Sequence, residues 1–249
     1  MEIMEAIRGR YTHRGLFLHK QIERDVLLDV LDAARWAPSG HNCQPWEFLV
    51  IDDRKQVEEL IAESGRIFFE HQKTRRNVKK YVDIWSNWIR WSEEELKTKA
   101  DGMYLSWVDR KAWEEMLPLE SEDEIKASFA KIFADRPGLF AVPPAFIFSL
   151  LDTEVKIPNA SPGLMHMTSM GAAIQNLKIA ARGKGLETHE FSVLYDLPHT
   201  QAMAKELLNI PSQLKIVSVM KIGYPDSQDT SSKTHVRKPL EKIVHWNRF

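Results

Sequence analysis

The sequence offers little for chemistry that depends on thiols or on a strong charge of one sign. Among its 249 residues there is one cysteine, Cys43, which has no partner for an internal disulfide or a multi-cysteine metal site. We expect Cys43 to be a small buried residue. The 34 Lys and Arg residues balance 35 Asp and Glu residues, for a formal charge of −1. This balance argues against a dedicated nucleic-acid-binding protein, which would carry a basic surface.

Long apolar runs and several common binding motifs are also missing. No stretch approaches the roughly 20 apolar residues that cross a bilayer, and residues 1–14 lack the apolar core of a signal peptide. There is no Gly-x-Gly-x-x-Gly or Gly-x-x-x-x-Gly-Lys loop and no His-x-x-x-His spacing. We therefore expect a cytoplasmic protein without a membrane segment, a nucleic-acid partner or a metal site.

What remains is an ordinary globular composition, 43% hydrophobic and 28% charged. Apolar periodicity predicts helices over residues 22–36, 54–63, 169–182 and 199–209. Apolar or alternating runs predict strands over 46–51, 145–151 and 214–222, and 186–191 is a strand or a tight connection. Strands separated by helices indicate an α+β fold, an α/β sandwich around a small sheet. We treat residues 1–249 as one domain, with a large helical insertion at about 65–136.

A cationic segment near the N-terminus is suited to binding a phosphate. Arg8, Arg10 and Arg14 supply planar guanidinium donors, and Thr12 supplies a hydroxyl. The alternative is a solvated basic helix end, because surface arginine clusters are common and weakly stabilising.

A polar loop bracketed by prolines, residues 38–45, is suited to a flat heterocycle. Ser39, Asn42 and Gln44 can each donate and accept hydrogen bonds. The alternative is a well-capped turn between a helix and a strand, in which Ser, Asn and Gly are expected anyway.

Both segments resemble the FMN-dependent nitroreductase family. Arg-Tyr-Thr-His-Arg at 10–14 resembles its Arg-Arg-Ser-x-Arg element, and residues 37–46 match its Ala-Pro-Ser-x-x-Asn-x-Gln-Pro-Trp element. Weaker matches follow in order: Ala-Val-Pro-Pro at 141–144, Gly-Ala-Ala-Ile-Gln-Asn-Leu at 171–177, Gly-Leu at 185–186, Gly-Tyr-Pro at 223–225 and Arg-Lys-Pro-Leu at 237–240. The resemblance covers residues 1–63 and 138–245 and leaves out the insertion.

The resemblance implies a nitroreductase-like fold with a small, mostly antiparallel sheet. It also implies a homodimer with FMN at the subunit interface, each site built from both chains. By the resemblance, four residues would contact the phosphate, the ribityl chain and the pyrimidine edge of FMN: Arg10, Tyr11, Thr12 and Arg14. Arg237 and Lys238 would complete the phosphate contacts. Residues that would come from the partner chain are Pro38, Ser39, Gly40, Asn42 and Gln44. Thr188 and His189 lie in the stretch that would present backbone N–H groups to flavin N5 and O4. Tyr11 stands where the family usually has Arg.

No nucleophile is needed in this interpretation, because the flavin carries the redox chemistry. We expect no catalytic residue beyond the flavin, with Arg14 stabilising negative charge near N1 and O2. The predicted reaction is ping-pong hydride transfer from NADH or NADPH to a planar, electron-poor nitroaromatic, quinone or enone. The alternatives are a family branch with other flavin chemistry, flavin fragmentation or ring dehydrogenation, and a non-catalytic flavin-binding module.

The tryptophan-rich insertion is the place to look for substrate contacts. Trp85 and Trp88 share one helical stripe with Trp91, so they would either pack the insertion onto the core or form an aromatic lid. Arg90 could receive an acidic substrate, and His166 is a packed or pocket-edge residue. The deiodinase branch of the family uses a Glu-x-x-x-Tyr…Lys lid motif. None of the five tyrosines here follows a Glu by four positions, which disfavours halotyrosine dehalogenation.

Overall fold

The computed structural model of the chain describes residues 2–72, 137–156, 163–226 and 240–248, with a few isolated residues between 115 and 131. The helices in these ranges are α1 (Ile3–Gly9), α2 (Arg24–Arg35), η1 (Gly40–Asn42), α3 (Arg54–Gln72), α8 (Pro137–Phe140), α9 (Leu164–Gly183), α10 (Val193–Asp196), α11 (Pro198–Leu207) and η2 (Leu240–Lys242). The strands are β1 (Trp46–Ile51), β2 (Ala145–Asp152), β3 (Glu187–Glu190) and β4 (Leu214–Gly223).

The strands form one sheet in the order β1-β2-β4-β3, and each neighbouring pair is antiparallel. In β1 the first residue, Trp46, lies opposite Leu151, and the last, Ile51, lies opposite Phe146. The short strand β3 lies along the end of β4, from Glu187 opposite Gly223 to Glu190 opposite Met220. The fold class predicted from the sequence, an α+β sandwich around a small antiparallel sheet, is confirmed.

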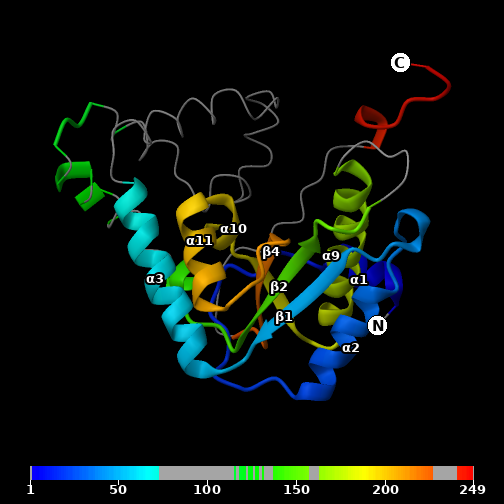
Figure 1. Cartoon of the computed structure of the whole chain (residues 1–249), viewed down its shortest axis with the longest axis horizontal. Coiled ribbons are helices and arrows are strands. Elements are labelled where there is room, and N and C mark those ends of the chain that lie inside the picture. Colours follow the sequence, from blue (N-terminus) through cyan, green and yellow to red (C-terminus); the bar gives the residue numbers. More distant parts are fainter. Residues whose placement is uncertain are drawn as a thin grey trace.

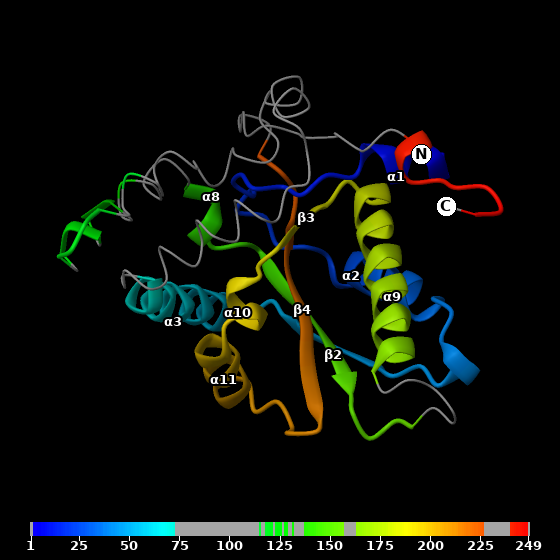
Figure 2. The ribbon, with the colours of Figure 1, turned by 90° about the horizontal axis from the view of Figure 1, so that it is seen from above.

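Helices cover both faces of the sheet (Figures 1 and 2), with α2 and α9 on one face and α3, α10 and α11 on the other. Strand β2 is buried on both sides, because Ala145 and Ile147 face the α2–α9 core while Phe146 and Phe148 face the other core. A fully buried strand needs no polar alternation, which explains its continuous apolar run. No helix among the described residues has both the length and the apolar character to span a membrane.

Two helices extend beyond the predicted boundaries. Helix α3 continues through Gln72 instead of ending near residue 63, and it passes through Gly65, where a Cβ would lie 3.3 Å from the ring of Phe140. Helix α9 begins at Leu164, five residues before the predicted Ser169. The predicted start of α3 is confirmed, because the Asp53 carboxylate accepts a hydrogen bond from the Gln56 backbone N–H at 3.0 Å.

The connection from α9 to β3 is a tight helix C-cap. Gly185 has φ +76°, its N–H donates to the Arg182 carbonyl at 3.1 Å, and the Leu186 N–H donates to the Ala181 carbonyl at 2.9 Å. This pair of bonds ends a helix at a residue that must adopt the left-handed conformation, which glycine does without strain. The cap turns the chain directly into β3 and so fixes where Thr188 and His189 lie.

Candidate functional site

The cationic N-terminal segment lies along β3. Thr12 forms an isolated parallel bridge with Thr188, and the His13 N–H donates to the Thr188 carbonyl at 2.9 Å. Two stretches that are about 175 residues apart in the chain therefore meet at the edge of the sheet. The structure thus brings the predicted residues Arg10, Tyr11, Thr12 and Arg14 beside the predicted pair Thr188 and His189.

A buried polar network supports this junction. His13 Nε2 donates to the Leu16 carbonyl at 2.9 Å, because a carbonyl can only accept, and Nδ1 then accepts from the Tyr11 hydroxyl at 3.4 Å. The Arg182 guanidinium lies 5.9 Å from the Tyr11 ring centroid and forms an ion pair with the buried carboxylate of Glu187. Tyr11, which stands where the family usually has Arg, is thus a buried residue of this network.

His189 is buried beside this network with an unsatisfied ring nitrogen. Its Nδ1 has no hydrogen-bond partner among the described residues. Burial lowers the pKa of His189 well below its usual value, and the positive charges of Lys221 and Arg14 lower it further. The imidazole is therefore neutral at pH 7. A buried polar atom without a partner is unusual in a folded protein and indicates a missing ligand or water.

The loop 38–45 has a strained backbone and lies exposed. His41, Asn42 and Gln44 all have positive φ, at 53°, 52° and 46°. Non-glycine residues adopt this conformation at a cost of about 1–3 kcal/mol each, and such strain gathers at functional sites. The Ser39 hydroxyl accepts from the Gln44 N–H at 3.0 Å, and the Gln44 side-chain amide donates to the Asn42 side-chain oxygen at 3.2 Å. The capped-turn interpretation is therefore correct for Ser39, while the strain is more than a turn requires.

The loop and the N-terminal segment lie at opposite ends of the sheet. The loop precedes the first residue of β1, whereas Thr188 pairs with Ile222, and Ile222 with Ala145, near the last residue of β1. Five residue steps along a strand separate these ends, or about 17 Å. Figure 2 shows the blue loop before β1 on the far side of α9 from β3. Within one chain, Asn42 and Gln44 therefore do not reach the predicted residues at Thr12 and Thr188.

Comparison with known proteins identifies the family. A model described as "Nitroreductase family" matches residues 7–224, most of the chain. The chain belongs to the nitroreductase family. The family predicted from the sequence is therefore confirmed, and with it the prediction of a nitroreductase-type oxidoreductase.

Relatives of the nitroreductase chain include enzymes of two kinds. It is 26% identical to a 4-nitrobenzoate reductase of Nocardioides sp. (strain LMS-CY), over 98% of this chain and 90% of the relative. It is 25% identical to an iodotyrosine deiodinase of Thermotoga neapolitana, over 99% of this chain and 98% of the relative. A crystal structure of oxidized iodotyrosine deiodinase bound to FMN and 3-iodo-L-tyrosine superposes with a TM-score of 0.60, 21% identity and full coverage of both chains.

The residues present in the nitroreductase chain fit an FMN. His189 Nδ1 is a buried polar atom that lacks a partner among the described residues, and it lies beside the segment that carries Arg14. The strand and the segment together present backbone and side-chain donors, which suit the oxygens and ring nitrogens of a flavin and its phosphate. Metal chemistry has no such support: within the described ranges no three His, Cys, Asp or Glu side chains gather closely enough to hold an ion.

Other predicted residues have different surroundings. His166, at the start of α9, donates from Nε2 to the Val155 carbonyl at 2.9 Å and so ties the helix to the end of β2. Cys43 is partly exposed, so the expectation of a buried filler was wrong, because the strained loop holds it at the surface. Five predicted residues lie outside the described ranges: Trp85, Trp88, Arg90, Arg237 and Lys238.

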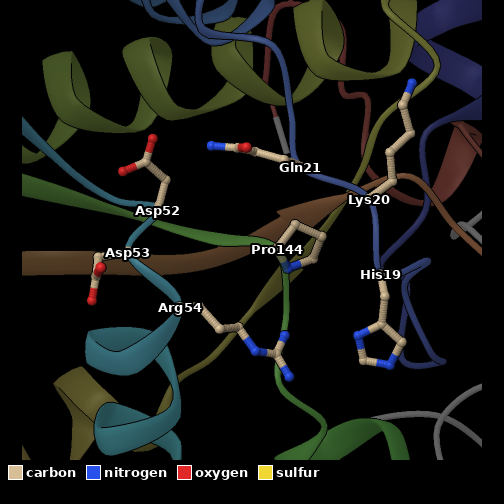
Figure 3. Close-up of a pocket in the computed structure, with 7 residues that line it drawn as sticks. All are labelled: His19, Lys20, Gln21, Asp52, Asp53, Arg54 and Pro144. Carbon is tan, nitrogen blue, oxygen red and sulfur yellow. The ribbon is translucent and has the colours of Figure 1, made fainter.

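A separate open pocket of about 740 Å³ lies where the loop before α2 meets the starts of α3 and β2 (Figure 3). Three of its charged residues have local partners: Asp53 caps α3, Arg54 pairs with Glu58, and Lys20 pairs with Glu23 at 3.2 Å. These groups stabilise the two chain turns that border the pocket.

Sequence reasoning missed two residues near the candidate site. Lys221 is fully buried in β4 directly opposite His189, and Gly138 of α8 packs against the backbone of Arg14. Lys221 lies between Met220 and Ile222 near the apolar end of the strand, and a charge in that setting was the signal that could have singled it out. Nothing in the sequence around Gly138 reveals its contact, because the contact joins segments that are more than 120 residues apart.

Proposed function

We propose that the chain is an FMN-dependent oxidoreductase that reduces a planar, electron-poor compound by ping-pong hydride transfer from NADH or NADPH. The acceptor classes are nitroaromatics, quinones and conjugated enones. The single observation that supports this best is the junction of residues 10–14 with β3, beside the unsatisfied Nδ1 of His189. The single cysteine and the balanced charge fit a cytoplasmic enzyme.

In this proposal the junction holds one half of the cofactor site. Arg10, Thr12 and Arg14, with Arg237 and Lys238, bind the phosphate, the ribityl chain and the pyrimidine edge. Thr188 and His189 would lie beside N5 and O4 of the bound flavin. Tyr11 contributes by packing, since its hydroxyl is already bonded to His13.

A second copy of the chain supplies the other half. The loop with Pro38, Ser39, Gly40, Asn42 and Gln44 lies about 17 Å along the sheet from the junction in its own chain. Helices α1, α2 and α9 and the C-terminal segment lie on one side of the molecule (Figures 1 and 2). Large exposed apolar residues on these elements or at their ends are Ile3, Leu28, Trp36, Leu164 and Trp246. Large exposed apolar residues are frequent at homodimer interfaces.

FMN, when bound, supplies the redox chemistry, and the chain supplies position, charge and exclusion of water. The Arg14 guanidinium places a permanent positive charge at the pyrimidine edge and so favours the anionic reduced ring. His189 is neutral at pH 7, so it adds no charge of its own to the site. Trp85 and Trp88 would cover the ring and stack a planar acceptor, with Arg90 available to an acidic one, while His166 holds the start of α9.

The test begins with the colour of the purified protein. We expect wild type to carry flavin absorbance, and Arg10→Ala or Arg237→Ala to bind FMN about ten- to a hundredfold more weakly, because each loses charge-assisted hydrogen bonds to phosphate. Arg54→Ala, on α3 and paired with Glu58, is the matched control and keeps the flavin. Wild type that shows no flavin and gains none with added FMN would refute the proposal.

A second experiment separates the chemistries. Bound flavin is reduced with NADH or NADPH and reoxidised anaerobically with a nitroaromatic, a quinone, an enone and 3-iodotyrosine. Rapid reoxidation by one of the first three supports the proposal. Reaction with iodotyrosine alone would place the chain with the deiodinase relatives, and products formed only under oxygen would indicate flavin fragmentation or ring dehydrogenation. A flavin that no nicotinamide reduces would indicate a binding module.

A further inference from the structure

Lys221 donates hydrogen bonds to the backbone carbonyls of the short helix α8 and of the residue after it. It is fully buried, and within the part of the chain that the structure describes its Nζ donates to three carbonyls: Gly138 at 3.2 Å, Leu139 at 2.5 Å and Ala141 at 2.8 Å. An ammonium has three donors, so all three are used. The carbonyls at the end of a helix lack helical partners, and Lys221 provides them for α8. Burying a charge costs free energy, so a lysine buried in this way indicates that the position of α8 matters to the fold.

Helix α8 is held on its other sides as well. The Phe140 ring packs against Phe68 and Phe69 of α3 and against Phe191, with centroids 5.4–5.8 Å apart. Phe191 also lies 4.5 Å below the Lys221 ammonium, within range of a cation–π contact. Strand β4, helix α3 and the residue after β3 therefore fix α8 from three directions.

The fourth side of α8 is the backbone of Arg14. A Cβ added to Gly138 would lie 1.9 Å from the Arg14 carbonyl oxygen and 2.9 Å from that of Gly15. Only glycine allows such an approach. On the opposite side, Thr12 and His13 are bonded to Thr188 of β3. Residues 12–15 are thus enclosed between β3 and α8.

We infer that Lys221 and Gly138 are positioning residues that set where Arg14 meets the cofactor. Lys221 holds α8 against the sheet, and Gly138 lets α8 approach until the Arg14 backbone rests on it. The inference rests on the proposed function, because it assumes that Arg14 contacts FMN.

The test is FMN affinity, measured by quenching of flavin fluorescence as each apoprotein is titrated. We expect Gly138→Ala and Lys221→Met each to weaken FMN binding about tenfold. Gly183→Ala is the matched control, since a Cβ there meets no atom within 4 Å, and it keeps wild-type affinity. Circular dichroism and size-exclusion chromatography check that each variant folds. Because the two variants lie on different elements, the test can still be made with one of them if the other does not fold.

A double-mutant cycle distinguishes positioning from general destabilisation. If Lys221 and Gly138 act through Arg14, their effects on FMN affinity shrink to less than twofold in an Arg14→Ala background. Two outcomes would overturn the inference while leaving the proposed function intact. One is folded variants that bind FMN with wild-type affinity, and the other is an equal loss of FMN affinity with and without Arg14. Wild type that binds no FMN would instead overturn both.

Discussion

The two halves of the candidate site are built differently within one chain. The half at residues 10–14 and 187–189 is closed by backbone bonds and contains buried Tyr11, His13 and Glu187. In the half at residues 38–45, residues 38–44 are partly to fully exposed, and the side-chain hydrogen bonds that the described residues make there stay within the loop. The first half is joined by contacts within the chain, whereas the second has a strained backbone and no contact with the first. The difference supports the proposal that a second copy of the chain completes the site.

The largest effect should come from breaking the assembly. Trp36→Glu and Leu164→Glu place a charge on the exposed apolar face, where Trp36 is 73% exposed. We expect the mass in solution to fall from a dimer to one chain of 28.9 kDa. FMN affinity should fall at least about a hundredfold, or roughly 2.7 kcal/mol. Light scattering and FMN titration measure the two effects.

The matched control for assembly is Ala62→Glu, a similar charge on the exposed side of α3 away from this face. It should change neither mass nor affinity. Monomeric variants that bind FMN as tightly as wild type would show that one chain suffices and would remove the distinction between the halves.

A smaller effect should appear in the pH dependence of the buried half. Burial lowers the pKa of Lys221 to about 7, whereas an unfolded chain keeps it near its usual 10.5. Between these values the unfolded state binds more protons, so stability rises with pH. We expect the unfolding free energy of wild type minus that of Lys221→Met to rise between pH 7 and 9. The slope should approach about 1.4 kcal/mol per pH unit.

Denaturant titrations at several pH values measure this slope. Lys215→Met is the control, because Lys215 is an exposed lysine on the same strand, and the corresponding difference should be flat. A flat curve for Lys221 would mean that its three carbonyl partners keep the ammonium charged in spite of burial.

The smallest effect should come from the strained loop. Asn42 has φ 52°, which glycine adopts freely and a β-branched residue does not. We expect Asn42→Val to weaken FMN binding more than Asn42→Gly does, by about 1 kcal/mol. Asn209, with φ 51° at the end of α11, is the matched control. Asn209→Val should lower thermal stability but leave FMN affinity unchanged. Equal affinities for the two Asn42 variants would mean that loop shape does not matter to the site.

Much of this molecule could be predicted from local patterns. The apolar run at 46–51 forms β1, and the Asp53 cap confirms the predicted helix start at residue 54. The helix predicted to end at residue 182 ends at Gly183, and Gly185 takes the left-handed conformation. These features depend on neighbouring residues, so periodicity and capping rules suffice to find them.

Contacts across the chain could not be predicted in this way. Helix α3 was expected to end near residue 63, but it continues through Gly65, on which Phe140 packs. Lys221 was assigned to a strand correctly, yet its three carbonyl partners come from residues 80 to 83 positions away. Tertiary packing overrides local propensity at such places, because burial and hydrogen-bond satisfaction are worth more than the propensity of one residue.

By itself the sequence determined the family, the α+β class and the residue types that suit a phosphate and a flat ring, because these are carried by short motifs and local periodicity. Only the tertiary structure decided that residues 10–14 join β3, that the loop at 38–45 lies at the other end of the sheet, and that a buried lysine holds α8 against Arg14. Those outcomes depend on which distant segments pack together. Local sequence patterns do not show which distant residue a side chain will contact.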